Sequence, residues 1–306
     1  MIRNNYGSLS KNIWLVDSNI YVFRAWYTWS KSLQDREGNS VNAVHGFLYF
    51  VYQLLSQEHP KYIGFAFDES LKHSHRKEIY PEYKLNRKSA PIDLRYQFDL
   101  CRKFLKAMGI AEFSSQYYEA DDIIGTLANY YRKQGNRIIL ITADKDLTQL
   151  IHHHDLWWEY GNQQKFDVAA IKKKFGVRPD QIADLLAIAG DKSDNIPGVP
   201  DIGLATAAKL LRRFDSLDNL IRCIPEIGRM KLRRAKYLQQ QIEDNLEQLK
   251  LSKQLTEIIC DAEDAPIDRS LNRDNNSANQ KALWQLFDLL EYSDSERQKW
   301  LKLIQL

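Results

Sequence analysis

The chain of 306 residues exceeds the usual size of one compact domain, and a hydrophobic content of 44% is typical of a soluble globular protein. The net charge of only +3 excludes a general polycation, so any affinity for nucleic acid has to come from local segregation of charge. Three widely separated cysteines exclude a disulfide framework and a cysteine zinc site. No apolar run approaches the ~20 residues of a membrane span, so we expect a soluble cytoplasmic protein with no membrane partner.

Three short apolar runs each end at an aspartate, namely Asp17, Asp68 and Asp144. The runs cover residues 13–17, 62–68 and 138–144. Segments with helical spacing of apolar residues lie nearby, at 44–55, 98–108 and 123–131. Alternating strands and helices predict a mostly parallel α/β sheet, whose ligands bind beyond the carboxyl ends of the strands. We therefore expect the three aspartates at one edge of one crevice.

More acidic residues follow the same pattern along the chain. They are Glu119, Asp121, Asp122, Asp146, Asp191 and Asp194. Those at 119–122 precede an apolar helix, where acids also favour the first turn for structural reasons alone. Carboxylates about 5 Å apart repel by roughly 3 kcal/mol at an effective dielectric constant near 20. A crowd of them predicts a bound cation, and oxygen ligands favour Mg²⁺ or Mn²⁺ over zinc.

Two basic regions indicate a nucleic-acid partner. Residues 72–88 combine basic side chains with Tyr80 and Tyr83, a pattern typical of single-strand binding, with a solvated loop as the alternative. A glycine turn at 195–203 leads into a helix at 204–214, whose free N–H groups suit a phosphate. The basic cluster after it consists of Arg212, Arg213, Arg222, Arg229, Lys231, Arg233, Arg234 and Lys236. It favours a phosphate-facing surface over a merely solvated one.

The strand-helix alternation ends near residue 178, which predicts an α/β domain at 1–178 and an all-helical domain at 179–306. Several motifs resemble, in unbroken order, those of the bacterial and phage 5′-nucleases, or flap endonucleases, relatives of the 5′-3′ exonuclease domain of bacterial DNA polymerase I. The motifs lie at 15–17 with 23–25, 80–87, 118–122, 143–146 and 190–199. The resemblance runs from about 13 to 260, and because the chain has no room for a polymerase domain, it implies a free-standing member.

The resemblance implies a Rossmann-like, PIN-like sheet with a helical arch at about 72–92. A helix-three-turn-helix domain would follow, with a helix-hairpin-helix at about 190–260 and then C-terminal helices. It also implies two metal clusters, of which one consists of Asp17, Asp68, Glu119, Asp121 and Asp122. The other consists of Asp144, Asp146, Asp191 and Asp194. All nine carboxylates of the family pattern are therefore present.

Other roles follow from the same resemblance. The residues expected to act in catalysis are Lys84, Arg76, Asp144 and Asp191. The residues expected to contact DNA are Arg24, Arg76, Tyr80, Tyr83, Lys84, Arg87, Gly198, Gly203, Arg233 and Arg234. Backbone carbonyls at Val199 and Ile202 would hold a potassium ion, in a hairpin where Asp201 and Ala205 replace the usual glycine and lysine of the family.

Together these features predict a monomeric, structure-specific 5′-nuclease that uses two Mg²⁺ ions, for which Mn²⁺ can substitute. Its substrate would be DNA with a 5′ flap or a free single-stranded 5′ end, hydrolysed in replication or repair. Two alternatives stay open. An RNase of the PIN class is disfavoured by the hairpin and the basic helical domain. A branched-DNA-binding protein with little catalysis is disfavoured by the complete set of carboxylates.

Overall fold

The computed structural model describes residues 10–69, 74–273 and 278–304. In this part of the chain a six-stranded sheet has the order β3-β2-β1-β4-β5-β6. Its strands are β1 (Asn12–Asp17), β2 (Tyr62–Ala66), β3 (Ala111–Phe113), β4 (Arg137–Ile141), β5 (Leu156–Glu159) and β6 (Gln164–Phe166). Neighbouring strands are parallel, except that β6 pairs antiparallel with β5 at one edge. The predicted mostly parallel α/β sheet is confirmed.

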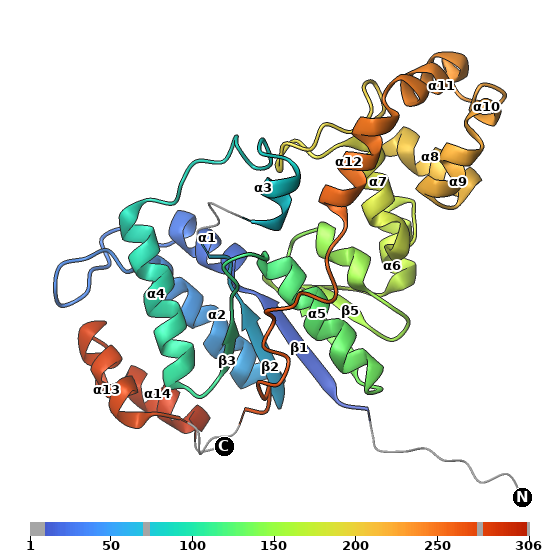
Figure 1. Ribbon diagram of the computed structural model, residues 1–306. Coiled ribbons are helices and arrows are strands. Elements are labelled where there is room, and N and C mark those ends of the chain that lie inside the picture. The colour runs from blue at the N-terminus through green and yellow to red at the C-terminus, as the bar shows by residue number, and fades with distance from the viewer. Residues whose placement is uncertain (1–9, 70–73, 274–277, 305–306) are drawn as a thin grey trace, which may run out of the picture.

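Helices cover both faces of the sheet (Figure 1). The helices along the first part of the chain are α1 (Ser18–Thr28), α2 (Asn42–Glu58), α3 (His75–Ile79), α4 (Ile92–Ala107), α5 (Ala120–Lys133) and α6 (Val168–Phe175). Side chains alternate along each strand, so Trp14 and Val16 of β1 face the α1, α2 and α4 layer, whereas Ile13 and Leu15 face α5. Both sets are buried, as a sheet covered on two sides requires. None of the described helices is long and apolar enough to cross a membrane.

The register of the sheet brings the acidic strand ends together. Asp17 pairs with Ala66 of β2, and its neighbour Val16 pairs with Ile141 of β4. Asp68 follows Ala66 by two residues, and Asp144 follows Ile141 by three. Because β2, β1 and β4 are adjacent and parallel, these carboxylates lie beyond the same edge.

A helical lobe follows the sheet (Figure 1, yellow to orange). Its helices are α7 (Ile182–Ala189), α8 (Leu204–Phe214), α9 (Leu217–Arg222), α10 (Ile224–Ile227), α11 (Ala235–Asp244) and α12 (Leu246–Thr256). They share an apolar core of their own, in which Leu186, Leu210 and Ile242 are fully or almost fully buried. Helix α7 packs against both α8 and α12, so the lobe is held around it.

The last two helices pack on the sheet domain and not on the helical lobe. Helices α13 (Gln280–Leu289) and α14 (Asp294–Ile304) cover α2 and α4, where Trp300 lies 4.8 Å from Phe104 between ring centroids. The predicted assignment of all of 179–306 to one helical domain is therefore wrong for these helices. Their apolar faces were visible in the sequence, but periodicity does not say which surface a helix covers. The boundary near 178 stays a prediction.

Replacing Phe287 with alanine is expected to lower the free energy of unfolding by ~3–5 kcal/mol, because this fully buried ring leaves a cavity against α4. Denaturant unfolding of the whole chain measures the change. The control is Trp284→Ala on the same helix, whose ring is 39% exposed and whose loss should cost about 1 kcal/mol or less. Equal effects of the two variants would contradict the packing of α13 on α4.

Candidate metal centre and nucleic-acid interface

Thr142 holds two of the strand-end aspartates. Its hydroxyl donates to Asp17 Oδ2 at 2.8 Å and accepts the backbone N–H of Asp144 at 2.9 Å. Thr142 is fully buried at the end of β4, so this bridge is shielded from water. A single threonine therefore fixes the relative position of Asp17 and Asp144. Sequence reasoning missed it, although a hydroxyl residue two positions before a strand-end acid is a usable signal.

A second bridge holds Asp68 against helix α5. Asn19 Nδ2 donates to Asp68 Oδ2 at 2.9 Å, and the backbone N–H of Ala120 donates to Asp68 Oδ1 at 2.7 Å. Ala120 is the first residue of α5, so Asp68 accepts one of the N–H groups that the helix itself leaves unpaired. Asp121 follows in the first turn of α5 and faces the same edge, because Asp144, Asp17 and Asp68 all act on its charge.

The crowding is visible in the protonation of these acids. Burial and the charge of Asp144 raise the pKa of Asp17 to about 7, and the same two causes raise the pKa of Asp146 to about 7. Burial and Asp144 also raise the pKa of Asp121 well above its ordinary value, and burial raises that of Asp68. Several buried acids thus lack a neutralising partner, and Asp146 Oδ1 makes no hydrogen bond, although Lys145 Nζ lies 3.2 Å away. These donors fit a hard divalent cation.

Lys145 connects the sheet to the loop after α7. Its Nζ lies 2.5 Å from Asp191 Oδ2 and 3.2 Å from Asp146 Oδ1. Asp191 also accepts the hydroxyl and N–H of Ser193 at 2.6 and 2.7 Å. Burial alone would raise the pKa of Asp191, but the hydrogen bonds from Lys145 and Ser193 lower it below its usual value. Asp191 therefore reaches the predicted site as a charged, paired carboxylate.

Two glycines close this loop. Asp191 and Ile196 exchange both backbone hydrogen bonds, at 2.8 and 2.9 Å. Gly190 and Gly198 both have positive φ, and a Cβ on Gly198 would come within 2.2 Å of Gly190 N. Gly198 is buried, its N–H donates to Ser252 Oγ and its carbonyl accepts from Gln248. The prediction that Gly198 contacts DNA does not fit this burial, because its backbone groups are already used inside the fold.

The arch after α3 lies directly on the acidic site. Lys84 Nζ is 2.9 Å from both carboxylate oxygens of Glu119 and 3.5 Å from Asp194 Oδ2. Tyr83 donates its hydroxyl toward the same two acids, at 3.0 and 3.1 Å. Burial alone would raise the pKa of Glu119, but Lys84 and Arg76 lower it below its ordinary value. Lys84 therefore lies over these carboxylates, and its role in catalysis stays a prediction.

Tyr83 differs from its predicted role as a base-stacking residue. Its ring is 2% exposed and packs with Ile196 and Leu255. Tyr80 is half-buried beside this cluster, and its hydroxyl donates to Glu82 at 2.8 Å. The alternation of aromatic and basic residues predicted exposure, but the loop and α12 cover the ring of Tyr83. Residues 72 and 73, where the predicted arch begins, lie outside the described residues.

Arg76 and Asp122 form a buried ion pair, and almost all polar atoms of the two side chains have hydrogen-bond partners. Arg76 Nη1 and Nη2 lie 2.6 and 2.8 Å from the two oxygens of Asp122, and its Nε donates to the Leu255 carbonyl at 3.0 Å. Asp122 also accepts the N–H groups of Glu119 and Ile259. Both side chains are almost inaccessible, with Arg76 at 3% and Asp122 at 0% exposure. In this arrangement neither side chain is available to a phosphate or a metal ion, so the predicted roles of Arg76 and Asp122 find no support here and stay predictions.

The remaining predicted contacts lie at the surface. Arg87 is half-exposed and pairs with Asp194. Arg24 on α1, Gly203 before α8, and Arg233 and Arg234 before α11 are all exposed. Several of these groups are therefore accessible to a bound strand.

Val199 and Ile202, the predicted potassium ligands, lie in the hairpin between α7 and α8 with buried side chains. The Ile202 N–H donates to the Val199 carbonyl at 3.2 Å. Asp201, which departs from the family pattern, accepts the Tyr237 hydroxyl at 2.5 Å. Whether a potassium ion binds here stays a prediction.

The carboxylates form two neighbouring groups and not one closed cage. Over the described ranges, no three His, Cys, Asp or Glu side chains converge closely enough to form a ready metal site. Glu119, Asp191 and Asp194 are drawn toward lysine and arginine partners instead. The electrostatic neighbours of Asp17 are Asp144 and Asp68, whereas those of Asp146 include Asp191 and Asp194.

Comparison with known proteins agrees with this geometry. Residues 12–176 match the family model of the 5′-3′ exonuclease N-terminal resolvase-like domain, and residues 177–279 match that of the 5′-3′ exonuclease C-terminal SAM fold. The 5′-3′ exonuclease of Buchnera aphidicola is 33% identical over 258 residues, which are 84% of this chain and 88% of that protein. DNA polymerase I of Bacillus caldotenax is 37% identical over 268 residues, 86% of this chain. The chain spans only 29% of the length of that polymerase.

Solved structures share the fold. The bacteriophage T5 5′-exonuclease with bound zinc has a TM-score of 0.67 at 22% identity, over 92% of this chain and 99% of that one. The catalytic core of Rad2 in complex with DNA substrate has a TM-score of 0.59 at 16% identity, over 96% of this chain and 92% of that one. At such identities the likeness shows the fold alone. The two matched domain models and the curated relatives show, as predicted, that this chain belongs to the 5′-3′ exonuclease family of DNA nucleases.

Proposed function

We propose that this protein hydrolyses DNA phosphodiesters at 5′ flaps and free 5′ ends, with Mg²⁺ as its cofactor and Mn²⁺ as a substitute. The observation that carries the proposal is the group of buried carboxylates, several with raised pKa values, directly beneath the arch residue Lys84. Buried negative charges of this kind destabilise the fold unless protons or cations neutralise them, and a phosphodiester brings further charge that needs neutralising. Family membership supports the same chemistry.

The chain offers ligands for two cations. Asp17, Asp68 and Asp121 would be the donors for one, and Asp144 and Asp146 would be donors for the other. Asp191 and Asp194 join the second group once Lys145 and Arg87 release them. Bound divalent ions would polarise the phosphate and lower the pKa of an attacking water. Thr142 and Asn19 keep the donors in place, because each holds a carboxylate through a buried or half-buried hydrogen bond.

The chain's own cations would position the phosphate. Lys84 lies between Glu119 and Asp194, so a small displacement of its ammonium group reaches a phosphate over the carboxylates. Arg87 is half-exposed at the same opening. Farther away, the free N-terminal turn of α8 at Gly203 and the exposed Arg233 and Arg234 suit contacts with a duplex backbone. A potassium ion at the hairpin carbonyls of 199 and 202 is part of this proposal.

One gel tests the proposal against its alternatives. Labelled 5′-flap, nicked, single-stranded and RNA–DNA substrates are each incubated with Mg²⁺ and with EDTA. Mg²⁺-dependent cleavage of the flap DNA supports the proposal. Preferential cleavage of RNA would favour a PIN-type RNase, and tight binding without cleavage would favour a branched-DNA-binding protein.

Asp144 is one of the proposed metal ligands, so its replacement tests the proposed site. Asp144→Asn is expected to lower the single-turnover rate by ~10³-fold or more, because a neutral amide is a poor ligand for a hard cation. The dissociation constant for flap DNA, measured in Ca²⁺ by fluorescence anisotropy, should change by less than about threefold, since phosphate contacts remain. The control is Asp268→Asn, an exposed acid distant in sequence from the site motifs. Full cleavage by Asp144→Asn would contradict the assignment of the site.

A second prediction uses the pH dependence of stability without metal. Because the folded-state pKa of Asp17 is raised from 3.8 to about 7, the folded state binds its proton more tightly than the unfolded state between these values. Stability therefore falls as pH rises from about 4 to about 7. In EDTA at pH 8, Asp17→Asn should be more stable than wild type by ~2 kcal/mol, because it removes a buried charge that the charges of Asp144 and Asp68 oppose.

At pH 3 the same variant and wild type should be nearly equally stable, because Asp17 is then largely protonated in both the folded and the unfolded state. Added Mg²⁺ should stabilise wild type more than the variant, since the metal binds the folded carboxylates. Asp268→Asn serves as the control and should change stability little at either pH. If Asp17→Asn lowers the free energy of unfolding at pH 8, the charge of Asp17 does not destabilise the metal-free fold.

The third prediction concerns Lys84. Lys84→Ala is expected to lower the single-turnover rate by ~10²-fold or more, as for the loss of one preorganised electrostatic contact, with little change in flap affinity. If the 5′ end threads beneath the arch, a bulky protein fixed on that end before enzyme addition should stop cleavage, whereas the same block added after binding should trap the DNA. Equal cleavage of blocked and free flaps would exclude threading.

A further inference from the structure

Arg76 and Asp122 meet where three helix ends come together. Arg76 lies on α3, and Asp122 lies in the first turn of α5. At the C-terminal end of α12, the carbonyls of Leu255 and Glu257 accept hydrogen bonds from Arg76 at 3.0 and 2.9 Å. The positive charge of Arg76 therefore lies at the negative end of the α12 dipole, and the negative charge of Asp122 lies at the positive end of the α5 dipole.

Each of these three helices carries a different part of the candidate site. Helix α5 carries Asp121 in its first turn, and the chain runs from α3 through the arch to Lys84. Helix α12 holds the loop after α7, because its Ser252 hydroxyl accepts the N–H of Gly198 at 3.3 Å. That loop contains Asp194. The ion pair therefore connects the helices that carry the first acids, the arch and the second acids.

All three nitrogens of the Arg76 guanidinium have partners inside the fold. Its Nε donates to the Leu255 carbonyl, and its Nη2 donates to the Glu257 carbonyl and to Asp122. Its Nη1 lies 2.6 Å from Asp122 and 3.5 Å from Glu119. Because Arg76 is almost inaccessible, a phosphate can reach it only after the guanidinium has left Asp122. That step leaves a buried carboxylate unpaired, which is strongly unfavourable.

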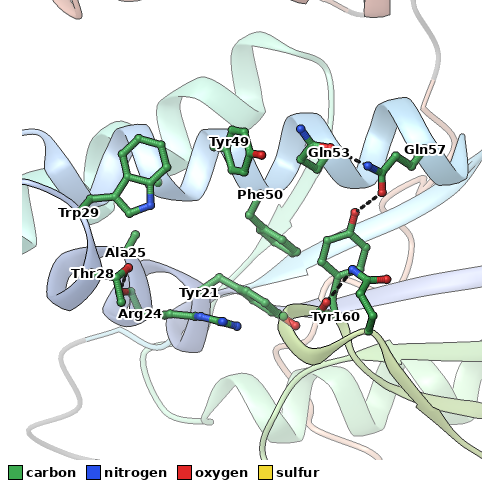
Figure 2. Close-up of a pocket in the computed structure, with 13 residues that line it drawn as sticks. Tyr21, Arg24, Ala25, Thr28, Trp29, Tyr49, Phe50, Gln53, Gln57 and Tyr160 are labelled. Carbon is green, nitrogen blue, oxygen red and sulfur yellow. Dashed lines mark hydrogen bonds between the residues drawn. The ribbon is translucent and has the colours of Figure 1, made fainter.

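A simpler polar link within the sheet domain serves as a comparison. Figure 2 shows the Tyr160 hydroxyl donating to Gln57 at 3.1 Å, which joins α2 to the turn after β5. This link is one hydrogen bond between neutral groups, and both of its residues belong to the sheet domain. Its removal therefore leaves the contact between the sheet domain and the helical lobe in place. Removal of the Arg76 link, in contrast, detaches α3 and α5 from the end of α12.

We propose that Arg76 is a positioning residue of the nuclease reaction and contacts neither the DNA nor the reacting atoms. Through Asp122 and the end of α12, it sets where the arch and the loop after α7 lie relative to α5. Lys84 and Asp194 then lie at the distances from Asp121 that the reaction needs. A misplacement of about 1 Å can lower a rate by ~10²-fold. The inference rests on the proposed function, because the positioning controls the rate of that reaction.

Single-turnover cleavage of 5′-flap DNA separates positioning from direct contact. At saturating Mg²⁺, Arg76→Lys should lower the rate by ~10-fold and Arg76→Gln by ~10²-fold, because neither side chain has the five donors of the guanidinium. The dissociation constant, measured in Ca²⁺ by fluorescence anisotropy, should change by less than about threefold, and the slope of its salt dependence should stay the same. A slope reduced by about one unit in Arg76→Gln would show a direct phosphate contact and overturn the proposal.

Asp122→Asn tests whether the two side chains act as one unit. The double variant Arg76→Gln/Asp122→Asn should cleave no more slowly than the slower single variant, because each change alone already breaks the pair. If Arg76 contacts a phosphate and Asp122 a metal ion instead, the two losses are separate and their fold-changes multiply, which would contradict the proposal. The double variant replaces the buried charges by neutral amides, so it keeps the test open if Arg76→Gln alone does not fold.

Hydrogen exchange of the free protein in EDTA measures the positioning without any reaction. Arg76→Lys should speed amide exchange at 80–87 and at 190–198 alike, because both segments lose a common anchor. Tyr160→Phe is the matched control, and it should change neither the exchange of these segments nor the rate. Phe287→Ala lowers stability far from the site and should keep the rate within about twofold at a temperature where it stays folded. An equal loss of rate in Phe287→Ala and Arg76→Lys would reduce the role of Arg76 to stability and overturn the proposal.

Flap cleavage by wild type keeps this inference apart from the proposed function. If wild type cleaves the flap in Mg²⁺ but Arg76→Lys changes neither the rate nor the exchange of the two segments, only the positioning role is overturned. If wild type does not cleave and the exchange still responds as expected, the proposed function is overturned and Arg76 positions the two segments all the same.

Discussion

Repulsion among buried carboxylates explains why the sheet, the arch and the loop after α7 meet at one place. Parallel strands deliver Asp17, Asp68 and Asp144 to one edge, and the register of the sheet leaves them no room to separate. Water would normally solvate and screen these charges, but burial excludes water from them. The protein therefore has to bring partial or full positive charge to the same place, and most of the tertiary contacts around the site do so.

The positive groups come from segments that are distant in sequence. The first N–H group of α5 donates to Asp68, and the N–H group of Glu119 just before the helix donates to Asp122. Both carboxylates therefore also lie at the positive end of the helix dipole. Lys145 brings the loop after α7 to the sheet, and Lys84 brings the arch to Glu119. The acids thus organise the fold around themselves. The lysines and arginines of the chain thus hold together the group of acids for which we propose bound cations.

The Arg76–Asp122 pair has a different role from the other contacts. A buried pair with bidentate geometry and satisfied neighbours gives little net stability, but the loss of one partner leaves an unpaired buried charge. It joins α3, α5 and the end of α12, so the base of the arch is attached to both lobes. The part of the arch near Lys84 is held by the buried Tyr83 hydroxyl and by the half-exposed Arg87, which both contact Asp194.

Much of the fold and site could be predicted because the signals are local. An apolar run that ends at Asp17 or Asp144 carries both the strand and the position of the acid. What the sequence could not predict depends on tertiary contacts. Asp122 looks like its neighbour Asp121 in sequence, and only the structure shows that Asp122 is paired with the buried Arg76. The ring of Tyr83 was misassigned for the same reason. Thr142 and Asn19 are common residue types, so their role appears only once the strands are paired.

The packing of α13 and α14 on α2 and α4 has a consequence for how the chain folds. The helical lobe is built from consecutive residues between 177 and 249, so its core needs only contacts that are near in sequence. The core on the α2 face combines residues from 14 to 108 with residues from 283 to 304. During synthesis on the ribosome the lobe can therefore fold before α13 and α14, which cover the α2 face, have been made. Contacts between residues so far apart in sequence also form slowly. The order in which the two cores are completed is the reverse of the order in which they begin.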